Sequence, residues 1–158
     1  MRSAQKKTKF NLTKFIFCIL ITEGAGILGS LATSTSVKSW YLTDLVKPSF
    51  NPPSWIFAPV WTLLFFLMGI ALYLVWTKKN NLLWFWVQLI LNIIWSYLFF
   101  GLRQPMLAFY EIVLLWIAIL ITIIKFWKLN KTASILLWPY LAWVSFASFL
   151  NLTIASLN

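Results

Sequence analysis

Five long runs of apolar residues, separated by short polar stretches, follow one another along the 158-residue chain. They cover residues 15–33, 55–76, 82–101, 106–127 and 133–157. Each run is about 20 residues long, which as an α-helix is the length needed to cross the hydrocarbon core of a bilayer. The pattern predicts an all-α integral membrane protein: a single five-helix transmembrane domain, residues 15–158, preceded by a basic N-terminal tail, residues 1–14.

The connections between the later runs are short and turn-like: Asn80-Asn81, Arg103-Gln104-Pro105 and Asn130-Lys131. Pro105 is well placed to open the fourth helix, where its missing N–H costs nothing. Helices joined this tightly must be antiparallel neighbours. We expect the first run to be retained as a span, and not removed as a signal peptide, because four further spans need an anchored start.

Composition supports a membrane protein, since 61% of the residues are hydrophobic and only 10% are charged. The net charge of +10 does not indicate nucleic-acid binding, because the Lys and Arg residues occupy the polar gaps between the runs. Ten of them fall on the side of the N-terminal tail, and three (Lys38, Lys47 and Arg103) fall on the other side. We expect a bacterial cell-membrane protein, and in that membrane the positive-inside rule predicts a cytoplasmic N-terminus and the C-terminus outside.

Two residue types limit the chemistry. The chain has no histidine, which removes the commonest haem ligand and the usual zinc ligand, so we expect no metal and no resident cofactor. Cys18 is the only cysteine, so no intramolecular disulfide can form.

The stretch from Trp40 to Trp61 contains four of the six prolines and interrupts the apolar pattern. Lys47-Pro48 and Pro52-Pro53 fix backbone angles and force the preceding residues into extended conformation. The first loop should therefore be stiff and fold over the bundle. It is either a lid or a rigid connector whose aromatic residues mark the membrane interface.

The first span carries small residues and one carboxylate. Gly24, Gly26, Gly29 and Ser30 allow a neighbouring helix to approach closely. Glu23 is costly at this depth, so it either faces the bundle interior or a cavity, or is protonated and hydrogen-bonded.

Polar and aromatic residues share faces on three of the predicted helices. Gln88, Asn92, Trp95, Ser96 and Phe99 lie on one face of the third helix; Tyr140, Trp143, Ala147 and Asn151 lie on one face of the fifth; Trp61 and Phe65 are one turn apart on the second. These faces should look inward. They form either a pocket for a flat, largely apolar molecule or an aromatic core joined by amides.

Several motifs in order resemble the translocator protein family, also called tryptophan-rich sensory proteins, peripheral benzodiazepine receptors or TspO/MBR. They are W-Y-L-T-D-L-V-K-P-S-F-N-P-P-S-W-I-F-A-P-V-W at residues 40–61, Q-L-I-L-N-I-I-W-S-Y-L-F-F-G-L-R-Q-P at residues 88–105, and P-Y-L-A-W-V-S-F-A-S-F-L-N at residues 139–151. The resemblance extends over about residues 20–158, nearly the whole chain.

The resemblance implies a five-helix membrane protein, commonly a homodimer, that binds tetrapyrroles such as protoporphyrin IX and synthetic isoquinoline and benzodiazepine ligands beneath the first loop. Matching motifs place Tyr41, Pro52 and Pro53 in the lid. The residues expected to bind the ligand in the bundle are Trp61, Phe65, Asn92, Trp95, Ser96, Trp143, Ala147 and Leu150. The chain lacks the tyrosine and basic residue of the family's cholesterol motif at its end, so the resemblance does not extend to cholesterol.

Two functions from different classes follow. The first is a receptor, sensor or transporter in which a porphyrin stacks on the tryptophans and its propionates reach Lys47 or the open mouth. The second is an enzyme that degrades protoporphyrin IX with light and oxygen, because the tryptophans tied to that activity in some relatives match Trp61 and Trp143. The sequence shows no nucleophile–base pair and no acid–base dyad.

Overall fold

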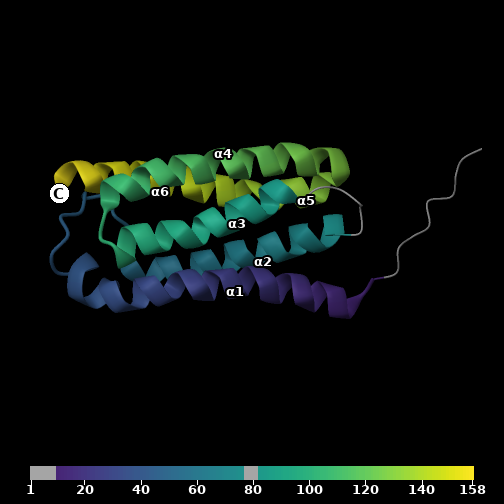
Figure 1. Cartoon of the computed structure of the whole chain (residues 1–158), viewed down its shortest axis with the longest axis horizontal. Helices are drawn as coiled ribbons and strands as arrows, with labels where there is room; N and C mark the ends of the chain where they lie inside the picture. Colours follow the sequence, from purple (N-terminus) through teal and green to yellow (C-terminus); the bar gives the residue numbers. More distant parts are fainter. Residues whose placement is uncertain (1–9, 77–81) are drawn as a thin grey trace, which may run out of the picture.

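The structure, a computed structural model, describes residues 10–76 and 82–158, and within these ranges all regular structure is helical. The helices are α1 (Leu12–Ser36), α2 (Phe57–Trp76), α3 (Leu83–Ser96), α4 (Pro105–Leu129), α5 (Lys131–Ile135) and α6 (Trp138–Leu157). The long helices run side by side along the longest axis of the molecule (Figure 1). The architecture is the all-α bundle that the sequence predicts.

Five segments are long and apolar enough to cross a membrane: Leu12–Ser34, Ser54–Trp76, Leu83–Gly101, Pro105–Leu129 and Lys131–Leu157. They confirm the five predicted spans, and their ends differ from the predicted ends by a few residues. The chain is therefore a multi-pass integral membrane protein. The predicted turn at Asn80-Asn81 lies outside the described residues.

Three helix ends depart from a plain α-helix. α1 continues into a π-helical turn, Val37–Tyr41, and α3 continues into another, Tyr97–Gly101. The fifth span is divided into α5 and α6 by a turn, and Pro139 lies in the first turn of α6. The first-turn N–H groups of a helix have no intrahelical partner, so a proline at this position interrupts no helical hydrogen bond. Starting a new helix here therefore accommodates Pro139 at little cost.

The turn between α3 and α4 reverses the chain within a few residues. Arg103 adopts a left-handed backbone conformation, with φ 54°, and the Gln104 N–H donates to the Leu98 carbonyl at 3.1 Å. Pro105 opens α4, as predicted. Adjacent helices with so short a link must lie antiparallel, and α3 and α4 pack against each other.

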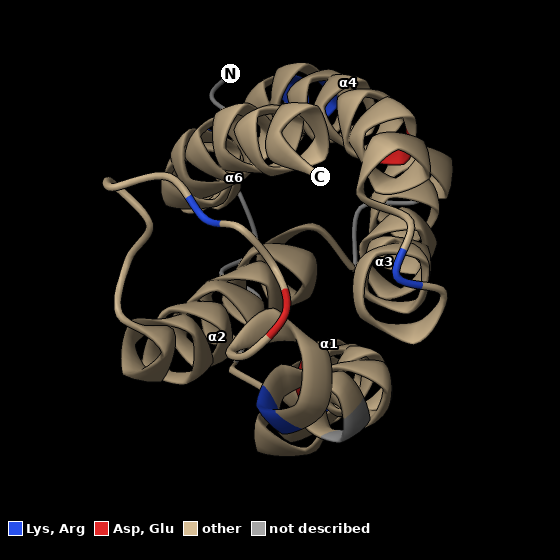
Figure 2. Ribbon diagram, turned by 90° about the vertical axis from the view of Figure 1, so that its left-hand side faces the viewer, with Lys and Arg blue, Asp and Glu red and all other residues tan. Residues whose placement is uncertain are grey.

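The remaining contacts set the order of helices around the bundle. α1 packs against α2 and α3, while α4 packs against α3 and α6. Viewed from the end that carries the first loop, the helices form a ring in which α2 and α6 face each other (Figure 2). At the opposite end α5 packs against α2 and closes the ring.

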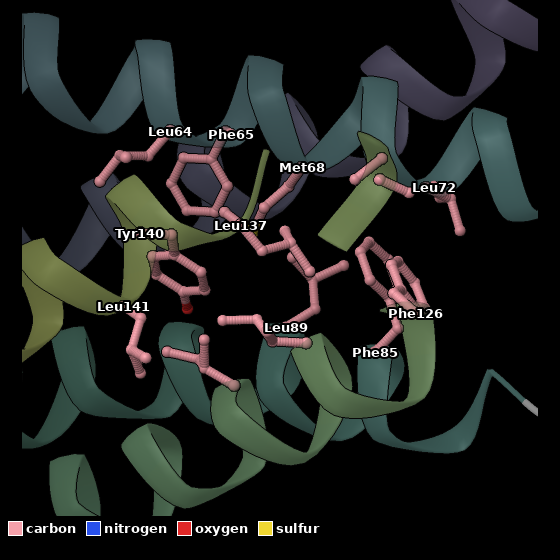
Figure 3. Packing of buried hydrophobic residues seen from close by; sticks show 14 of the residues in the cluster. Leu64, Phe65, Met68, Leu72, Phe85, Leu89, Phe126, Leu137, Tyr140 and Leu141 are labelled. Atoms are coloured by element: carbon pink, nitrogen blue, oxygen red, sulfur yellow. The ribbon is translucent and has the colours of Figure 1, made fainter. Parts of the chain in front are cut away.

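A packed apolar core fills the end of the bundle near α5. Phe85 and Phe126 stack with ring centroids 5.8 Å apart, and Leu72, Leu137 and Tyr140 are buried in the same cluster (Figure 3). A smaller cluster, which includes Tyr41, Phe99 and Leu150, lies at the loop end.

Glycines bring α1 and α2 into close contact. A Cβ atom at Gly69 would lie 2.6 Å from Ile19 Cδ1 and 2.9 Å from Ile19 Cα, and one at Gly26 would lie 2.6 Å from the Phe65 ring. Gly24, in contrast, has no heavy atom within 4 Å of its Cβ position. The predicted close approach therefore involves Gly26 but not Gly24, and Gly69 completes it from α2.

We predict that Gly69→Ala destabilises the bundle by about 1–3 kcal/mol, because the added methyl group meets the α1 backbone, which cannot rotate away. Gly24→Ala is the matched control, since it adds the same methyl group to open space and removes a helix penalty of about 1 kcal/mol. Thermal unfolding in detergent should give a lower midpoint for the first variant only. Equal midpoints for the two variants would contradict the assignment of Gly69 to the helix contact.

Candidate ligand-binding site

A cavity of about 410 Å³ lies among α1, α2, α3 and α6 toward the loop end of the bundle. This volume is within the range of small-molecule sites. Its lining includes these residues predicted from the sequence: Tyr41, Trp61, Phe65, Asn92, Trp95, Ser96, Trp143, Ala147 and Leu150. The structure thus brings together predicted side chains from α2, α3 and α6 and from the turn after α1.

Aromatic rings form much of the cavity wall. Trp61 and Phe65 on α2 lie 5.7 Å apart at an interplanar angle of 31°. Trp95 on α3 stacks on Phe99 at 5.3 Å and 24°. These rings present flat apolar surface to the cavity, which suits a planar aromatic molecule.

Buried amides hold the helices around the cavity. Asn92 Nδ2 donates to the Tyr140 hydroxyl at 2.9 Å, and Trp95 Nε1 donates to Asn151 Oδ1 at 3.0 Å. Asn151 Nδ2 in turn donates to the Pro105 carbonyl at 2.7 Å. The polar faces of α3 and α6 therefore line a cavity and also join helices. The pocket and the amide-joined core, which the sequence left as alternatives, are both present.

Trp143 is the exception among these polar groups. Its Nε1 atom is buried and has no hydrogen-bond partner among the residues that the structure describes. A buried donor without a partner is unfavourable, by about 1–3 kcal/mol.

The wall formed by α1 was missed by the sequence analysis. Glu23, Ile27 and Ser30 line the cavity at positions i, i+4 and i+7, together with Gly26 and Gly29. This helical spacing was a signal that could have marked the face. Glu23 therefore faces a cavity, one of the two alternatives left open for it.

The first loop is attached to the bundle at several points. Tyr41 Oη donates to Asn51 Oδ1 at 2.8 Å, and the Asn158 side chain bonds both the N–H and the carbonyl of Val46, each at 3.0 Å. Phe50 stacks on Phe149 of α6 at 5.3 Å. The loop crosses the end of the bundle between α1 and α2 and passes near α6 (Figure 2).

Sequence comparison identifies the family. The TspO/MBR family model matches residues 18–157. The chain belongs to the TspO/MBR family. It is 49% identical over 148 residues to the tryptophan-rich protein TspO of Chlorobaculum tepidum, covering 89% of this chain and 93% of the relative. It is 44% identical to the TspO of Archaeoglobus fulgidus (94% and 99% covered) and 38% identical to the human translocator protein (71% and 70% covered). The resemblance inferred from the motifs is confirmed.

Of the loop residues predicted for the TspO/MBR lid, Tyr41 lines the cavity, whereas Pro52 and Pro53 are not among the lining residues and lead into the 3₁₀ turn Ser54–Ile56. Lys47 does not line the cavity either. Its ammonium group donates to the Tyr41 carbonyl and lies 5.1 Å from the centre of the Tyr41 ring. The lid role of the loop stays a prediction.

Tyr41 connects the loop to the cavity. Burial raises the pKa of its phenol, and the hydrogen bond to Asn51 offsets part of that rise. A raised pKa keeps the hydroxyl protonated at neutral pH, so it can serve as the donor to Asn51. The bond should be lost only when the pH rises through this raised pKa.

We predict that Tyr41→Phe speeds hydrogen exchange of the loop amides, residues 42–53, by about fivefold, because a typical hydrogen bond contributes about 1 kcal/mol. Tyr97→Phe is the control, since Tyr97 is exposed at the same end of the bundle. Exchange would be followed by mass spectrometry in detergent. Unchanged loop exchange in Tyr41→Phe would show that this bond does not hold the loop.

Proposed function

We propose that the chain is a membrane receptor, sensor or transporter that binds tetrapyrroles, represented by protoporphyrin IX, and other flat ligands of the isoquinoline and benzodiazepine type. The observation that carries the proposal is the cavity of about 410 Å³ walled by Trp61, Phe65, Trp95 and Trp143. Family membership supports it, because one relative in the TspO/MBR family is named a tryptophan-rich sensory protein and others are named translocator proteins.

The charges of the site suggest how a porphyrin would lie. Among the described residues that line the cavity none is Lys or Arg, so anionic propionates are poorly matched inside it. Lys47 in the loop offers a cation at the mouth. The macrocycle would therefore stack on the tryptophans with its propionates directed toward the loop. With no histidine in the chain, metal-free porphyrin should bind at least as well as haem.

A second candidate function is light- and oxygen-dependent degradation of the bound protoporphyrin IX. Its specific support is that Trp61 and Trp143, the residues to which the family resemblance assigns this activity, line one cavity. An indole on either side of a photoexcited porphyrin could donate an electron to it. Dioxygen would be the oxidant.

A dark titration followed by illumination tests both candidates. We predict saturable binding of protoporphyrin IX in the dark, weakened severalfold by Trp143→Phe because the stacking surface shrinks. If the protein is only a receptor, illumination will cause no more loss of porphyrin than occurs in buffer. Loss that depends on the protein and disappears in Trp143→Phe would support the enzyme. Absorbance and fluorescence of the porphyrin report both quantities.

Trp138→Phe is the matched control for this experiment. Trp138 is on the same helix but half exposed and outside the cavity lining, so its replacement should change neither binding nor photochemistry. Absence of saturable binding to the wild-type protein would contradict both candidate functions.

We further propose that the first loop faces away from the cytoplasm in a bacterial cell membrane. The support is the concentration of Lys and Arg on the opposite side of the bundle. Cys18 is buried, so it should not react with a membrane-impermeant maleimide and a single added cysteine suffices. We predict that Ser49→Cys is labelled in intact cells to the same extent as after lysis. Labelling that requires lysis would reverse the orientation.

A further inference from the structure

Helix pairings define an inner end of the cavity, remote from the loop. Along the bundle axis, Gly26 is level with Phe65 and Gly29 is level with Ser96. Asn92 is level with Tyr140, to which it is hydrogen-bonded. Glu23 lies one turn below Gly26 and is therefore at the inner end. At a rise of 1.5 Å per residue, it is about 20 Å from Val37, the lining residue where α1 ends.

The hydroxyl side chains that line the cavity farther toward the loop accept hydrogen bonds from the cavity side. Ser30, Thr33 and Thr62 each donate their hydroxyl proton to a carbonyl of their own helix, at 2.7, 3.4 and 2.9 Å. Their oxygens retain only lone pairs for the cavity. Asn92 has committed its Nδ2 group to Tyr140. Its carbonyl oxygen can still accept a hydrogen bond from a ligand.

Glu23 adds a carboxylate to these acceptors. It is half-buried, and it has no hydrogen bond or ion pair with any other residue in the described ranges. It is also the one carboxylate among the described lining residues, which include no Lys or Arg. An acidic side chain within a membrane span normally pairs with a partner or marks a ligand path. Here the protein supplies no partner, whereas the cavity supplies space for one.

The aromatic walls match the same kind of ligand. Trp61 and Phe65 lie between Glu23 and the loop, and their ring faces attract cations as well as flat apolar groups. An aromatic enclosure with a carboxylate at its end is suited to an organic cation.

We propose that the inner end of this cavity recognises a protonated amine, held by the Glu23 carboxylate, on the leading edge of a flat aromatic ligand. The inference rests on the proposed function, because it assigns a ligand chemistry to the same cavity. It sets a polarity for binding: a cationic nitrogen enters first, and acidic groups stay at the mouth near Lys47. Neutral ligands bind through the rings alone and gain nothing from Glu23.

Two fluorescent probes with one aromatic body test the proposal: pyrenemethylamine, which is an ammonium at neutral pH, and pyrenemethanol, which is neutral. The full chain would be placed in phosphatidylcholine nanodiscs, and quenching of its tryptophans by each probe would be measured against empty nanodiscs. We expect the ammonium probe to bind about tenfold more tightly than the alcohol, as a charge-assisted hydrogen bond provides. In Glu23→Gln that preference should fall to within about twofold.

Glu111→Gln is the matched control. Glu111 is another carboxylate within a span, but it is buried on α4 and does not line the cavity. It should retain the full preference for the ammonium probe. Binding of pyrenemethanol to Glu23→Gln with wild-type affinity would show that the cavity itself is intact.

The outcomes separate this inference from the function on which it rests. Saturable binding of both probes with equal affinity, or a preference that survives in Glu23→Gln, would overturn the role of Glu23 and leave the receptor proposal standing. Loss of the preference in Glu111→Gln as well would also overturn it, because the effect would then be one of overall charge. Failure of both probes and of protoporphyrin IX to bind saturably would overturn the receptor proposal itself.

Discussion

The structure depends on close contact between helix backbones in a solvent that provides no hydrophobic drive for helices to associate. Lipid tails are as apolar as leucine, so packing and internal hydrogen bonds must hold such a bundle together. Gly69 and Gly26 supply such a contact, where α1 and α2 meet through the Ile19 backbone and the Phe65 ring. Toward the loop, α2 and α6 meet through aromatic rings, as in the Trp61–Tyr140 pair at 6.2 Å and the Phe57–Trp143 pair at 6.1 Å. The cavity lies beside these rings.

The spans could be predicted from the sequence because their length is fixed by the bilayer and not by tertiary contacts. Their ends were harder to predict. The π-helical turn that carries Tyr41 extends the first helix into a region whose sequence predicts a loop. Such turns have no distinct sequence pattern. The break before α6 had a signal in Pro139, but an apolar run continues through it and conceals the turn.

The candidate site could be predicted in part for a related reason. The faces of α2, α3 and α6 combine rings with amides at helical spacing, and such faces must turn inward in a membrane. The α1 wall could not be recognised because its glycines and hydroxyls look like packing residues. Glu23 was the sole indication that this face borders a cavity. Partners such as Asn92 and Tyr140 are remote in sequence, and only the fold shows that they meet.

The attachment of the first loop links two parts of the molecule that are distant along the chain. Asn158 and Phe149 hold the loop at Val46 and Phe50; Phe149 lies on α6, the helix that carries Trp143, and Asn158 caps its C-terminus. The helix that forms the Trp143 wall of the cavity is therefore the same helix to which the loop is anchored, so the outer segment and the interior of the bundle share one rigid element.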